Sequence, residues 1–531
     1  MIPKPPFACE LGIEDEIAGF EALKPRLGEL WSAVFPGDDA AYTSVVVPSL
    51  TLDQQELRDL PGASCYEERL LFLMIRLRNP MARLVYVTSV PIHPLVVEYY
   101  LQLLVGIPAS HARARLTLLA AHDHSPRPLT EKVLERPRLL QRIRAAVPDR
   151  ARAYLTVFNA TALERKLAVL LGIPMNGLDP ALSDLGTKSG SRRVFREAGI
   201  GHARGAEDLR STQEIEEALL DLRGRVPGIG KAVLKLNQGF SGAGNALFQF
   251  PAGGSREAVR RALDALELPG AQDAAAYLGR FAEQGGVVEE YITAPEVASP
   301  SVQLRVNALG NPHLSSTHEQ VLAGPTGQVY VGCRFPAREE YRLRLQEAGL
   351  RIAAVLAAKG VVSRFSVDFL ATRGGTSGPW DLTALEINLR MGSTTHPMLA
   401  LRFLTGGGLD AATGLFRSPD GTTKYYRATD SLAAEAYRGL LPEDLLDILT
   451  INKLAFNHRS ATGVLFHMFG AISQFGKVGV IAIGNTAREA EELFARTGTI
   501  LDDETGYPRA QPSRAGPAPA TTRADTARDS S

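Results

Sequence analysis

The sequence predicts an α/β protein with more than one domain. Its first third alternates apolar runs of strand length with segments of helical periodicity, a pattern typical of a mainly parallel sheet covered by helices. The 531 residues exceed the usual size of a single domain, about 100–200 residues. Hydrophobic residues make up 45% of the chain and charged residues 22%, which provides enough apolar side chains for several cores.

The first predicted domain covers residues 1–182. Its expected strands are four apolar runs at residues 44–50, 83–90, 115–121 and 153–158. Helical patterns lie between them at residues 94–104 and 129–146, and Pro137 interrupts the second pattern. No G-x-G-x-x-G loop follows the first run, so the sequence does not predict a dinucleotide site in this domain.

The rest of the chain divides into three further parts. Strand patterns and Gly-rich turns predict a second domain over residues 183–415, and two apolar strands with a helix predict a small α/β domain over residues 416–507. A capping box at residues 486–489 begins that helix, and Gly498 is its expected end. Residues 508–531 contain only small or polar residue types, so we expect them to form a disordered tail.

The charge balance argues against a dedicated nucleic-acid-binding protein. Lys and Arg together number 58, as do Asp and Glu, so there is no surplus of cations for phosphate backbones. The N-terminal residues lack the apolar segment of a secretory signal, and no stretch reaches the length of about 18 apolar residues typical of a membrane span. Cys9, Cys65 and Cys333 lie far apart, which is typical of a reducing compartment. We therefore expect a cytoplasmic protein with no nucleic-acid or membrane partner.

The strongest indication of chemistry is a pair of apolar strands around a Gly-rich turn at residues 365–390. Side chains alternate faces along a strand, so Asp368 of the first strand and Glu386 and Asn388 of the second are expected on one face. The opposite, core face of the second strand is assigned to Leu385, Ile387 and Leu389. Two carboxylates and an amide oxygen form an oxygen-ligand set suited to Mg²⁺ that holds nucleotide phosphates.

Arg390 follows on the same face and offers a planar cation to those phosphates. Taken alone, the hairpin is equally consistent with a solvated polar face over a half-buried core.

A second pattern joins a strand lysine to a glycine loop. Lys235 lies within the apolar run 232–236, and a cation in that setting is expected to face an anion. The loop at residues 239–245 follows directly, and its backbone N–H groups can approach phosphate oxygens. No G-K-[ST] closes the loop, so it is not a Walker A motif, and an ordinary Gly-rich hairpin is the alternative.

A third pattern is the strand end at residues 287–296. Glu289 to Ile292 form a strand-to-linker segment that can present backbone groups to an adenine edge, and Glu296 can hold ribose hydroxyls. An ordinary acidic strand end is the alternative interpretation.

In this order, the patterns resemble the ATP-grasp superfamily, including the D-alanine–D-alanine ligases. Lys188 lies eleven residues before Gly199 of an Ala-Gly-Ile turn and supplies the first lysine of that arrangement. The resemblance implies that Lys188 and Lys235 contact the nucleotide phosphates together with the loop residues Gly239, Ser241, Gly242 and Gly244. It also implies an adenine hinge at Glu289, Tyr291 and Ile292, a ribose contact at Glu296, a Mg²⁺ site at Asp368, Glu386 and Asn388, and a catalytic role for Arg390.

The flanking segments also resemble one branch of this superfamily. Residues 1–182 are similar to its pre-ATP-grasp domain. Residues 452–494, with the stretches 315–320 and 332–336, resemble the family of peptide ligases related to that of pheganomycin biosynthesis.

The resemblance implies an ATP- and Mg²⁺-dependent ligase that joins a carboxylate to an amine of an amino acid or peptide. An acyl phosphate would form with release of ADP, and the amine would then displace phosphate. Mn²⁺ is the alternative metal, and a homodimer is left open. The rival hypotheses are a free amino-acid ligase, a phosphoryl transferase on the same scaffold, and a non-catalytic nucleotide-binding protein.

Overall fold

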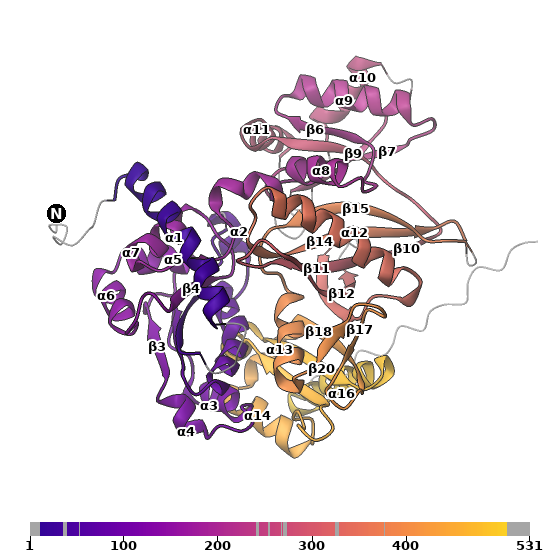
Figure 1. Cartoon of the computed structure of the whole chain (residues 1–531). Coiled ribbons are helices and arrows are strands. Elements are labelled where there is room, and N and C mark those ends of the chain that lie inside the picture. The colour runs from indigo at the N-terminus through magenta and orange to yellow at the C-terminus, as the bar shows by residue number, and fades with distance from the viewer. Residues whose placement is uncertain are drawn as a thin grey trace, which may run out of the picture.

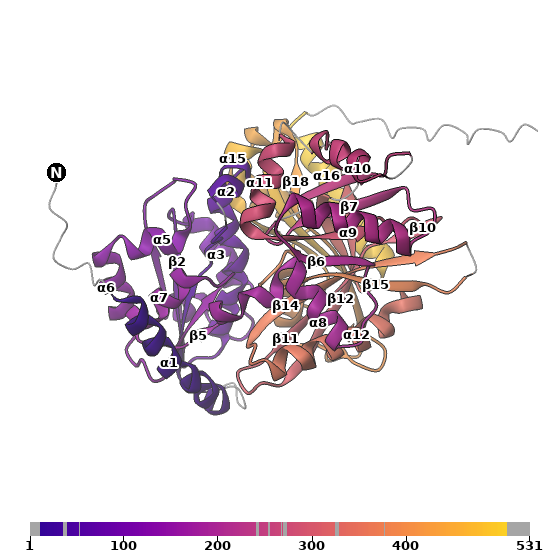
Figure 2. The same ribbon diagram turned by 90° about the horizontal axis from the view of Figure 1, so that it is seen from above.

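The structure is a computed structural model that describes residues 11–34, 40–52, 54–239, 244–252, 255–266, 268, 273–323, 329–375 and 378–506. The expected tail at residues 508–531 lies outside this range. The chain forms an N-terminal α/β domain, a small upper lobe and a large central sheet, onto which the C-terminal elements are built (Figures 1 and 2). None of the helices in the described ranges combines the length and apolar character needed to cross a membrane.

The N-terminal domain has a parallel sheet with the strand order β3-β2-β1-β4-β5, which confirms the predicted α/β class. Its strands are β1 (Tyr42–Val47), β2 (Ala82–Thr88), β3 (Leu116–Ala120), β4 (Ala153–Val157) and β5 (Met175–Asn176). The α-helices are α1 (Ile13–Val34), α2 (Gln54–Asp59), α3 (Pro94–Gln102), α4 (Ala109–Arg113), α5 (Leu129–Leu134), α6 (Pro137–Ala145) and α7 (Ala162–Leu171). Two 3₁₀ segments complete it, η1 (Ala63–Arg78) and η2 (Pro180–Gly186). As expected, Pro137 separates two helices, because it begins α6.

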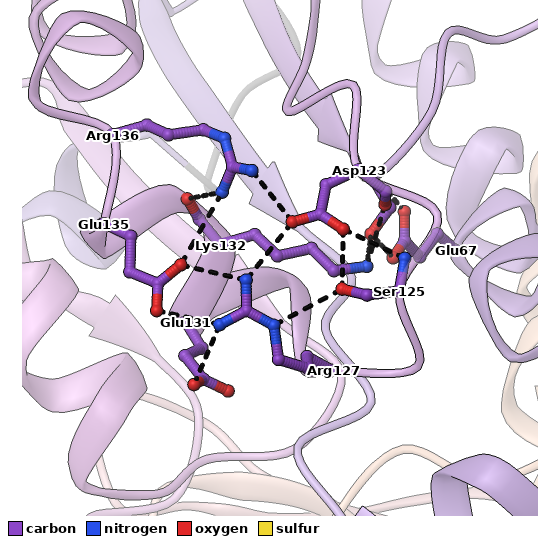
Figure 3. Close-up of polar contacts among 9 residues, drawn as sticks. Glu67, Asp123, Ser125, Arg127, Glu131, Lys132, Glu135 and Arg136 are labelled. Carbon is purple, nitrogen blue, oxygen red and sulfur yellow. Dashed lines mark hydrogen bonds and ion pairs between the residues drawn. The ribbon is translucent and has the colours of Figure 1, made fainter.

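A network of charged side chains holds the loop that follows β3 (Figure 3). Asp123 accepts hydrogen bonds from the Ser125 hydroxyl at 2.6 Å and from the Arg136 guanidinium at 2.8 Å. These contacts hold the pKa of Asp123 well below its usual range, with the Ser125 hydrogen bond as the largest cause. The buried Lys132 ammonium donates to the Ser89 hydroxyl at 2.9 Å and to the Asp123 carbonyl at 3.0 Å. The charges at this sheet edge therefore bind one another and fix the ends of β2 and β3.

The upper lobe is an antiparallel sheet with the strand order β6-β9-β7-β8 and helices packed on it. Its strands are β6 (Gly205–Leu209), β7 (Lys231–Leu236), β8 (Asn245–Gln249) and β9 (Gly286–Glu290). Its helices are α9 (Thr212–Arg225), α10 (Arg256–Asp264) and α11 (Ala274–Gln284). Helix α8 (Lys188–Glu197) lies between this lobe and the central sheet, with its apolar side chains in the core of the central sheet. Thr187 caps α8 by accepting a hydrogen bond from the Gly190 N–H at 2.9 Å. Gly190 is required because a Cβ there would lie 1.9 Å from the Asp184 carbonyl oxygen.

The central sheet contains eleven strands among the described residues and extends into the C-terminal segment. Its first part comprises β10 (Glu296–Ala298), β11 (Pro300–Val306), β12 (Pro312–Ala323), β13 (Val329–Phe335), β14 (Ser363–Arg373) and β15 (Asp381–Asn388). Helix α12 (Glu339–Ala358) packs on β11 and β12, and α13 (Thr395–Thr405) follows β15. The apolar core between α12 and this sheet includes Val302, Leu304, Phe365, Val367 and Ile387.

The C-terminal strands continue the same sheet, because β18 pairs with β13. They are β16 (Gly408–Asp410), β17 (Leu415–Arg417), β18 (Thr423–Ala433), β19 (Gly463–His467) and β20 (Lys477–Gly484). The remaining elements are η3 (Glu435–Gly439), α14 (Pro442–Ile451), η4 (Phe469–Ala471), α15 (Ile472–Phe475) and α16 (Ala487–Glu504). A domain boundary at residue 416 stays a prediction, and the sheet itself crosses it. Thr486 caps α16 as expected, but the helix continues past Gly498 to Glu504, so the expected end was wrong.

Candidate active site

A cavity of about 1630 Å³ lies where the upper lobe faces the central sheet. It extends to Tyr66 and Arg69 of the N-terminal domain and to Tyr425 and Asp430 of β18. Most of the residues singled out by sequence line it, namely Lys188, Lys235, Gly239, Gly244, Glu289, Tyr291, Ile292, Asp368, Glu386, Asn388 and Arg390. The fold therefore brings together residues that are spread over about 200 positions of the chain.

Strands β14 and β15 place the expected oxygen ligands side by side. They pair antiparallel, with Asp368 opposite Glu386 and Ser366 opposite Asn388. The Asn388 amide donates to Asp368 Oδ2 and to Glu386 Oε1, both at 3.1 Å, so it bridges the two carboxylates. Arg390 donates to Asn388 Oδ1 at 3.1 Å, which keeps its guanidinium on the cavity face.

The two carboxylates differ in their electrostatic environment. Burial raises the pKa of Asp368, and the negative charge of Glu386 raises it further. Burial also disfavours the charged form of Glu386, but Lys188 and Lys235 stabilise its carboxylate and hold its pKa below the usual range. Two adjacent carboxylates form a pair that a divalent cation would stabilise, because it would offset their mutual repulsion. The Asn388 oxygen faces Arg390, so the amide would have to turn over for its oxygen to join the two carboxylates as a ligand.

A β-bulge in this hairpin corrects one expectation. The pairing of Asp368 with Glu386 is followed directly by that of Phe369 with Ala384, so Leu385 is the extra residue. Leu385 lines the cavity next to Glu386, and Ala384 takes the core position that strict alternation assigned to Leu385. Ile387 is buried in the core as expected. The bulge thus adds an apolar side chain to the cavity wall.

The two lysines approach the same carboxylate. Lys188 forms an ion pair with Glu386, and Lys235 is close enough to stabilise that charge as well. Asn237, just after β7, fixes the start of α8, because its side-chain oxygen accepts from the Ser189 N–H at 2.9 Å and its carbonyl accepts from the Lys188 N–H at 3.3 Å. These two hydrogen bonds hold the first turn of α8 against the end of β7, the strand that carries Lys235.

Glu289 occupies a buried ionic cluster rather than an open linker. Its carboxylate lies 2.7 Å from Lys235 Nζ and accepts from Arg192 at 2.8 Å. Burial opposes the charge, but the two cations hold the pKa of Glu289 below its usual range. The lysine predicted to face an anion does so. The side chain of Glu289 belongs to this cluster, and the adenine contact expected at this segment stays a prediction.

Of the residues expected to contact adenine and ribose, Tyr291 and Ile292 line the cavity and Glu296 does not. The Tyr291 N–H donates to the Lys231 carbonyl at 3.3 Å. Glu296 lies instead in β10 and forms an ion pair with Arg373 on the neighbouring strand β14. Ser241 and Gly242 of the glycine loop lie outside the described residues.

Three polar residues of the site were not identified from the sequence. Gln320 of β12 donates to Asp368 at 2.8 Å, Asn237 fixes the start of α8, and Arg192 shares the carboxylate of Glu289 with Lys235. For two of these residues, the spacing from a lysine in the sequence could have indicated their place in the site. Asn237 lies two positions after Lys235, as expected for the same strand face, and Arg192 lies four after Lys188, as expected for the same helix face. The position of Gln320 beside Asp368 depends on β11, which pairs with β12 on one side and with β14 on the other. No local sequence pattern indicates this pairing.

Two family models match parts of the chain. The family described as IQCH-like, ATP-grasp matches residues 272–412, which include β14, β15 and the hinge. The family described as PGM1 C-terminal domain matches residues 444–497.

Two relatives cover most of the chain. L-propargylglycine–L-glutamate ligase of Streptantibioticus cattleyicolor is 30% identical over 477 residues, which represent 87% of this chain and 94% of that ligase. IQ motif-containing protein H of Danio rerio is 21% identical over 550 residues, which cover 93% of this chain and 51% of that protein.

Solved structures share the fold at low sequence identity. Biotin carboxylase from Campylobacter jejuni, solved with a β,γ-ATP ligand, has a TM-score of 0.53 at 12% identity and matches 88% of this chain and 96% of its own. The ADP complex of N5-carboxyaminoimidazole ribonucleotide synthetase has a TM-score of 0.50 at 12% identity, with 88% and 97% of the two chains covered. These likenesses show a common fold.

Proposed function

Because this chain belongs to the ATP-grasp ligases that form C–N bonds, in the family of the L-propargylglycine–L-glutamate ligase, we propose that it uses ATP to join the carboxylate of one amino acid to the amine of another. The observation that carries the proposal is the single cavity in which two lysines, two carboxylates and Arg390 converge. The name of that relative specifies two amino acids, which supports free amino acids over longer peptides as substrates.

The nucleotide would occupy the cavity between the upper lobe and β15. Lys188 and Lys235 would bind its phosphates, with Lys188 turning from Glu386 to a phosphate oxygen. The adenine ring would lie near the backbone of Tyr291 and Ile292, in contact with the apolar side chain of Leu385. Arg192 and Glu289 would keep Lys235 in place.

The oxygen donors of the hairpin fit Mg²⁺ better than a softer metal. Asp368, Glu386 and Asn388 offer carboxylate and amide oxygens, which are the ligands of hard cations, and Mn²⁺ accepts the same set. Bound there, the cation would neutralise charge on the phosphates and position the phosphoryl group for in-line transfer.

The reaction would proceed in two displacements within the cavity. A carboxylate oxygen of the first substrate attacks the γ-phosphorus of ATP, and ADP leaves. The amine of the second substrate then attacks the acyl carbon, loses a proton and expels inorganic phosphate. Arg390 can bind oxygens of the transferring phosphoryl group with its planar fork, and its bond to Asn388 holds it there.

Isotope transfer tests this mechanism directly. We expect ¹⁸O from a labelled carboxylate substrate to appear in inorganic phosphate, with ADP as the nucleotide product. Label in AMP would instead indicate an acyl adenylate, and a stable phosphorylated acceptor would indicate a phosphoryl transferase. No amino acid-dependent ATP turnover across a panel of the twenty common amino acids, singly and in pairs, would contradict the substrate class.

A further inference from the structure

A second cluster of ligand-type side chains lies beside the cavity, outside the proposed nucleotide site. It consists of His396 of α13, Asp430 of β18 and His467 of β19, all buried. His396 Nε2 lies 3.0 Å from His467 Nε2, and Asp430 Oδ1 lies 3.2 Å from the first nitrogen and 3.0 Å from the second. Within the described part of the chain, it is the only group of three or more His, Cys, Asp or Glu residues with ligand atoms this close together.

Hydrogen bonds alone do not satisfy this triangle of atoms. If both Nε2 atoms carry hydrogens toward Asp430, two donors face each other across 3.0 Å. If only one nitrogen carries a hydrogen, the lone pair of the other faces a carboxylate lone pair at 3.0–3.2 Å. One of the three contacts is therefore repulsive in either protonation state. A cation between the three atoms would make all three contacts favourable.

The dimensions of the triangle match a metal site. Imidazole and carboxylate ligands lie about 2.0–2.1 Å from Zn²⁺ and similar ions, so two ligands are about 2.8–3.0 Å apart at right angles and about 3.3–3.4 Å apart at the tetrahedral angle. The three observed separations, 3.0, 3.0 and 3.2 Å, fall between these values. The fold also leaves room for the ring of His467, because a Cβ at Gly479 on the adjacent strand would lie 2.1 Å from its Nε2.

We propose that His396, Asp430 and His467 form a binding site for a first-row transition-metal ion of the Zn²⁺ class. Two imidazoles and one carboxylate suit such an ion, whereas Mg²⁺ and Ca²⁺ prefer all-oxygen sets. A separate small cavity of about 30 Å³, lined by both histidines and Arg69, has room for about one water molecule as a further ligand.

Two positively charged side chains near Asp430 affect which metal ions the cluster can bind. Arg69 donates to Asp430 Oδ2 at 3.1 Å, the carboxylate oxygen that is not shared by the histidines. The Lys477 ammonium is also near enough to interact with Asp430. These cations weaken the binding of any divalent ion, so a resident metal must gain its affinity from the imidazole nitrogens. Arg69 at the same time orients the carboxylate, as partners of ligating carboxylates commonly do.

The site would tie together three elements that meet beside the proposed active site. Asp430 lines the large cavity, and α13 begins five residues after Arg390. A metal at this point would fasten α13 to β18 and β19 and so stabilise one wall of the substrate region. Its role is structural, and it does not depend on the proposed ligase reaction.

Cobalt titration of the full chain tests the proposal with a readout other than activity. Protein stripped with a chelator and free of nucleotide is titrated with Co²⁺, which gives visible d–d absorption when bound by nitrogen and oxygen ligands, and with Zn²⁺ as competitor. We expect about one equivalent to bind, and the variants His396→Ala, His467→Ala and Asp430→Asn to lose about 100-fold or more in affinity. Zn²⁺ should raise the melting temperature of the wild type and not that of the variants.

Two controls separate this site from other sources of binding. His318→Ala removes another fully buried histidine, on β12, and should leave the Co²⁺ spectrum unchanged. Glu386→Gln alters the expected Mg²⁺ site and should also leave it unchanged. Wild-type protein that binds neither Co²⁺ nor Zn²⁺ would overturn the proposal, as would equal binding by folded Asp430→Asn and His467→Ala. Where a ligand variant fails to fold, absence of binding by the wild type still refutes the proposal, and an unchanged Co²⁺ spectrum in Glu386→Gln and His318→Ala still supports it.

Discussion

Asp368 and Glu386 are direct partners across the antiparallel strands β14 and β15, and Asn388 bridges their carboxylates. This register places two negative charges next to each other on a half-buried face of the sheet, and Lys188 forms an ion pair with Glu386. A pair of carboxylates in such a position is costly unless cations accompany it. This cost supports the proposal that a divalent cation and nucleotide phosphates complete the site.

The first prediction concerns Glu386. Glu386→Gln keeps the shape of the side chain but removes one negative ligand and the partner of Lys188. We expect the rate of ADP release to fall about 10²–10³-fold, because metal stabilisation of transferring phosphoryl groups is worth several kcal/mol. Asp381→Asn, an exposed change on the same strand, is the matched control and should retain activity. A wild-type rate in Glu386→Gln would refute the ligand assignment.

Neighbouring glutamates of β9 provide a test of the buried ionic cluster. Glu289→Gln leaves Lys235 and Arg192 without their buried counter-charge, and we expect a loss of about 3–5 kcal/mol in the free energy of unfolding. Glu290→Gln removes an ion pair with Arg204, whose side chain is 57% exposed, and should cost about 1 kcal/mol or less. Urea unfolding of both variants measures the difference. Equal stabilities would show that the cluster does not hold the upper lobe together.

Arg390 is expected to act on the reaction more than on nucleotide binding. Arg390→Lys loses the planar fork, and Arg390→Ala loses the charge as well. We expect kcat to fall by about 10²–10³-fold in the alanine variant, the usual effect of removing a transition-state donor, with little change in ATP affinity. Steady-state kinetics and melting temperature are measured on the same preparations. Near-normal kcat with a lowered melting temperature would assign Arg390 a structural role.

The bulge at Leu385 predicts opposite effects for Leu385 and Ile387, two apolar residues that flank Glu386 in β15. Leu385→Ala removes a cavity-wall side chain, so we expect ATP affinity to fall roughly tenfold with a small change in stability. Ile387→Ala empties a core position and should cost about 2–5 kcal/mol of stability with ATP affinity nearly unchanged. Calorimetric ATP binding and urea unfolding distinguish the two. A stability loss in both variants, with ATP affinity unchanged in both, would mean that the hairpin follows strict alternation.

Glu68 gives a prediction on pH dependence. Burial raises the pKa of its carboxyl from the usual 4.5 to about 7, although the Gly470 N–H donates to it at 3.2 Å. The folded chain therefore keeps a proton that the unfolded chain releases. This contribution to stability is fully present below pH 4.5 and is lost as the pH rises through about 7. We expect Glu68→Gln to reduce the decline in unfolding free energy across that interval, whereas the exposed Glu435→Gln should leave it unchanged.

Local patterns were sufficient to predict four of the five parallel strands of the N-terminal domain, all but β5, and the hairpin of Asp368 and Glu386. Apolar runs of four to eight residues and period-2 alternation depend on neighbouring positions, so they can be read from short segments. Helix ends were less predictable. The capping box at Thr486 correctly predicted where α16 begins, but Gly498 did not end it. A glycine inside a helix costs only about 1 kcal/mol relative to alanine, and packing along the helix can outweigh that cost.

By itself, the sequence determined the α/β class, the strands that carry the chemistry and the residue types at the candidate site. Only the tertiary structure decided three features: the bulge that turns Leu385 into the cavity, the burial of Glu289 between Lys235 and Arg192, and the cluster of His396, Asp430 and His467. His396 and His467 are 71 positions apart, and no periodic pattern relates them. Contacts of this kind depend on which strands pair and in which register, and that is decided by burial of the whole apolar core rather than by any single segment.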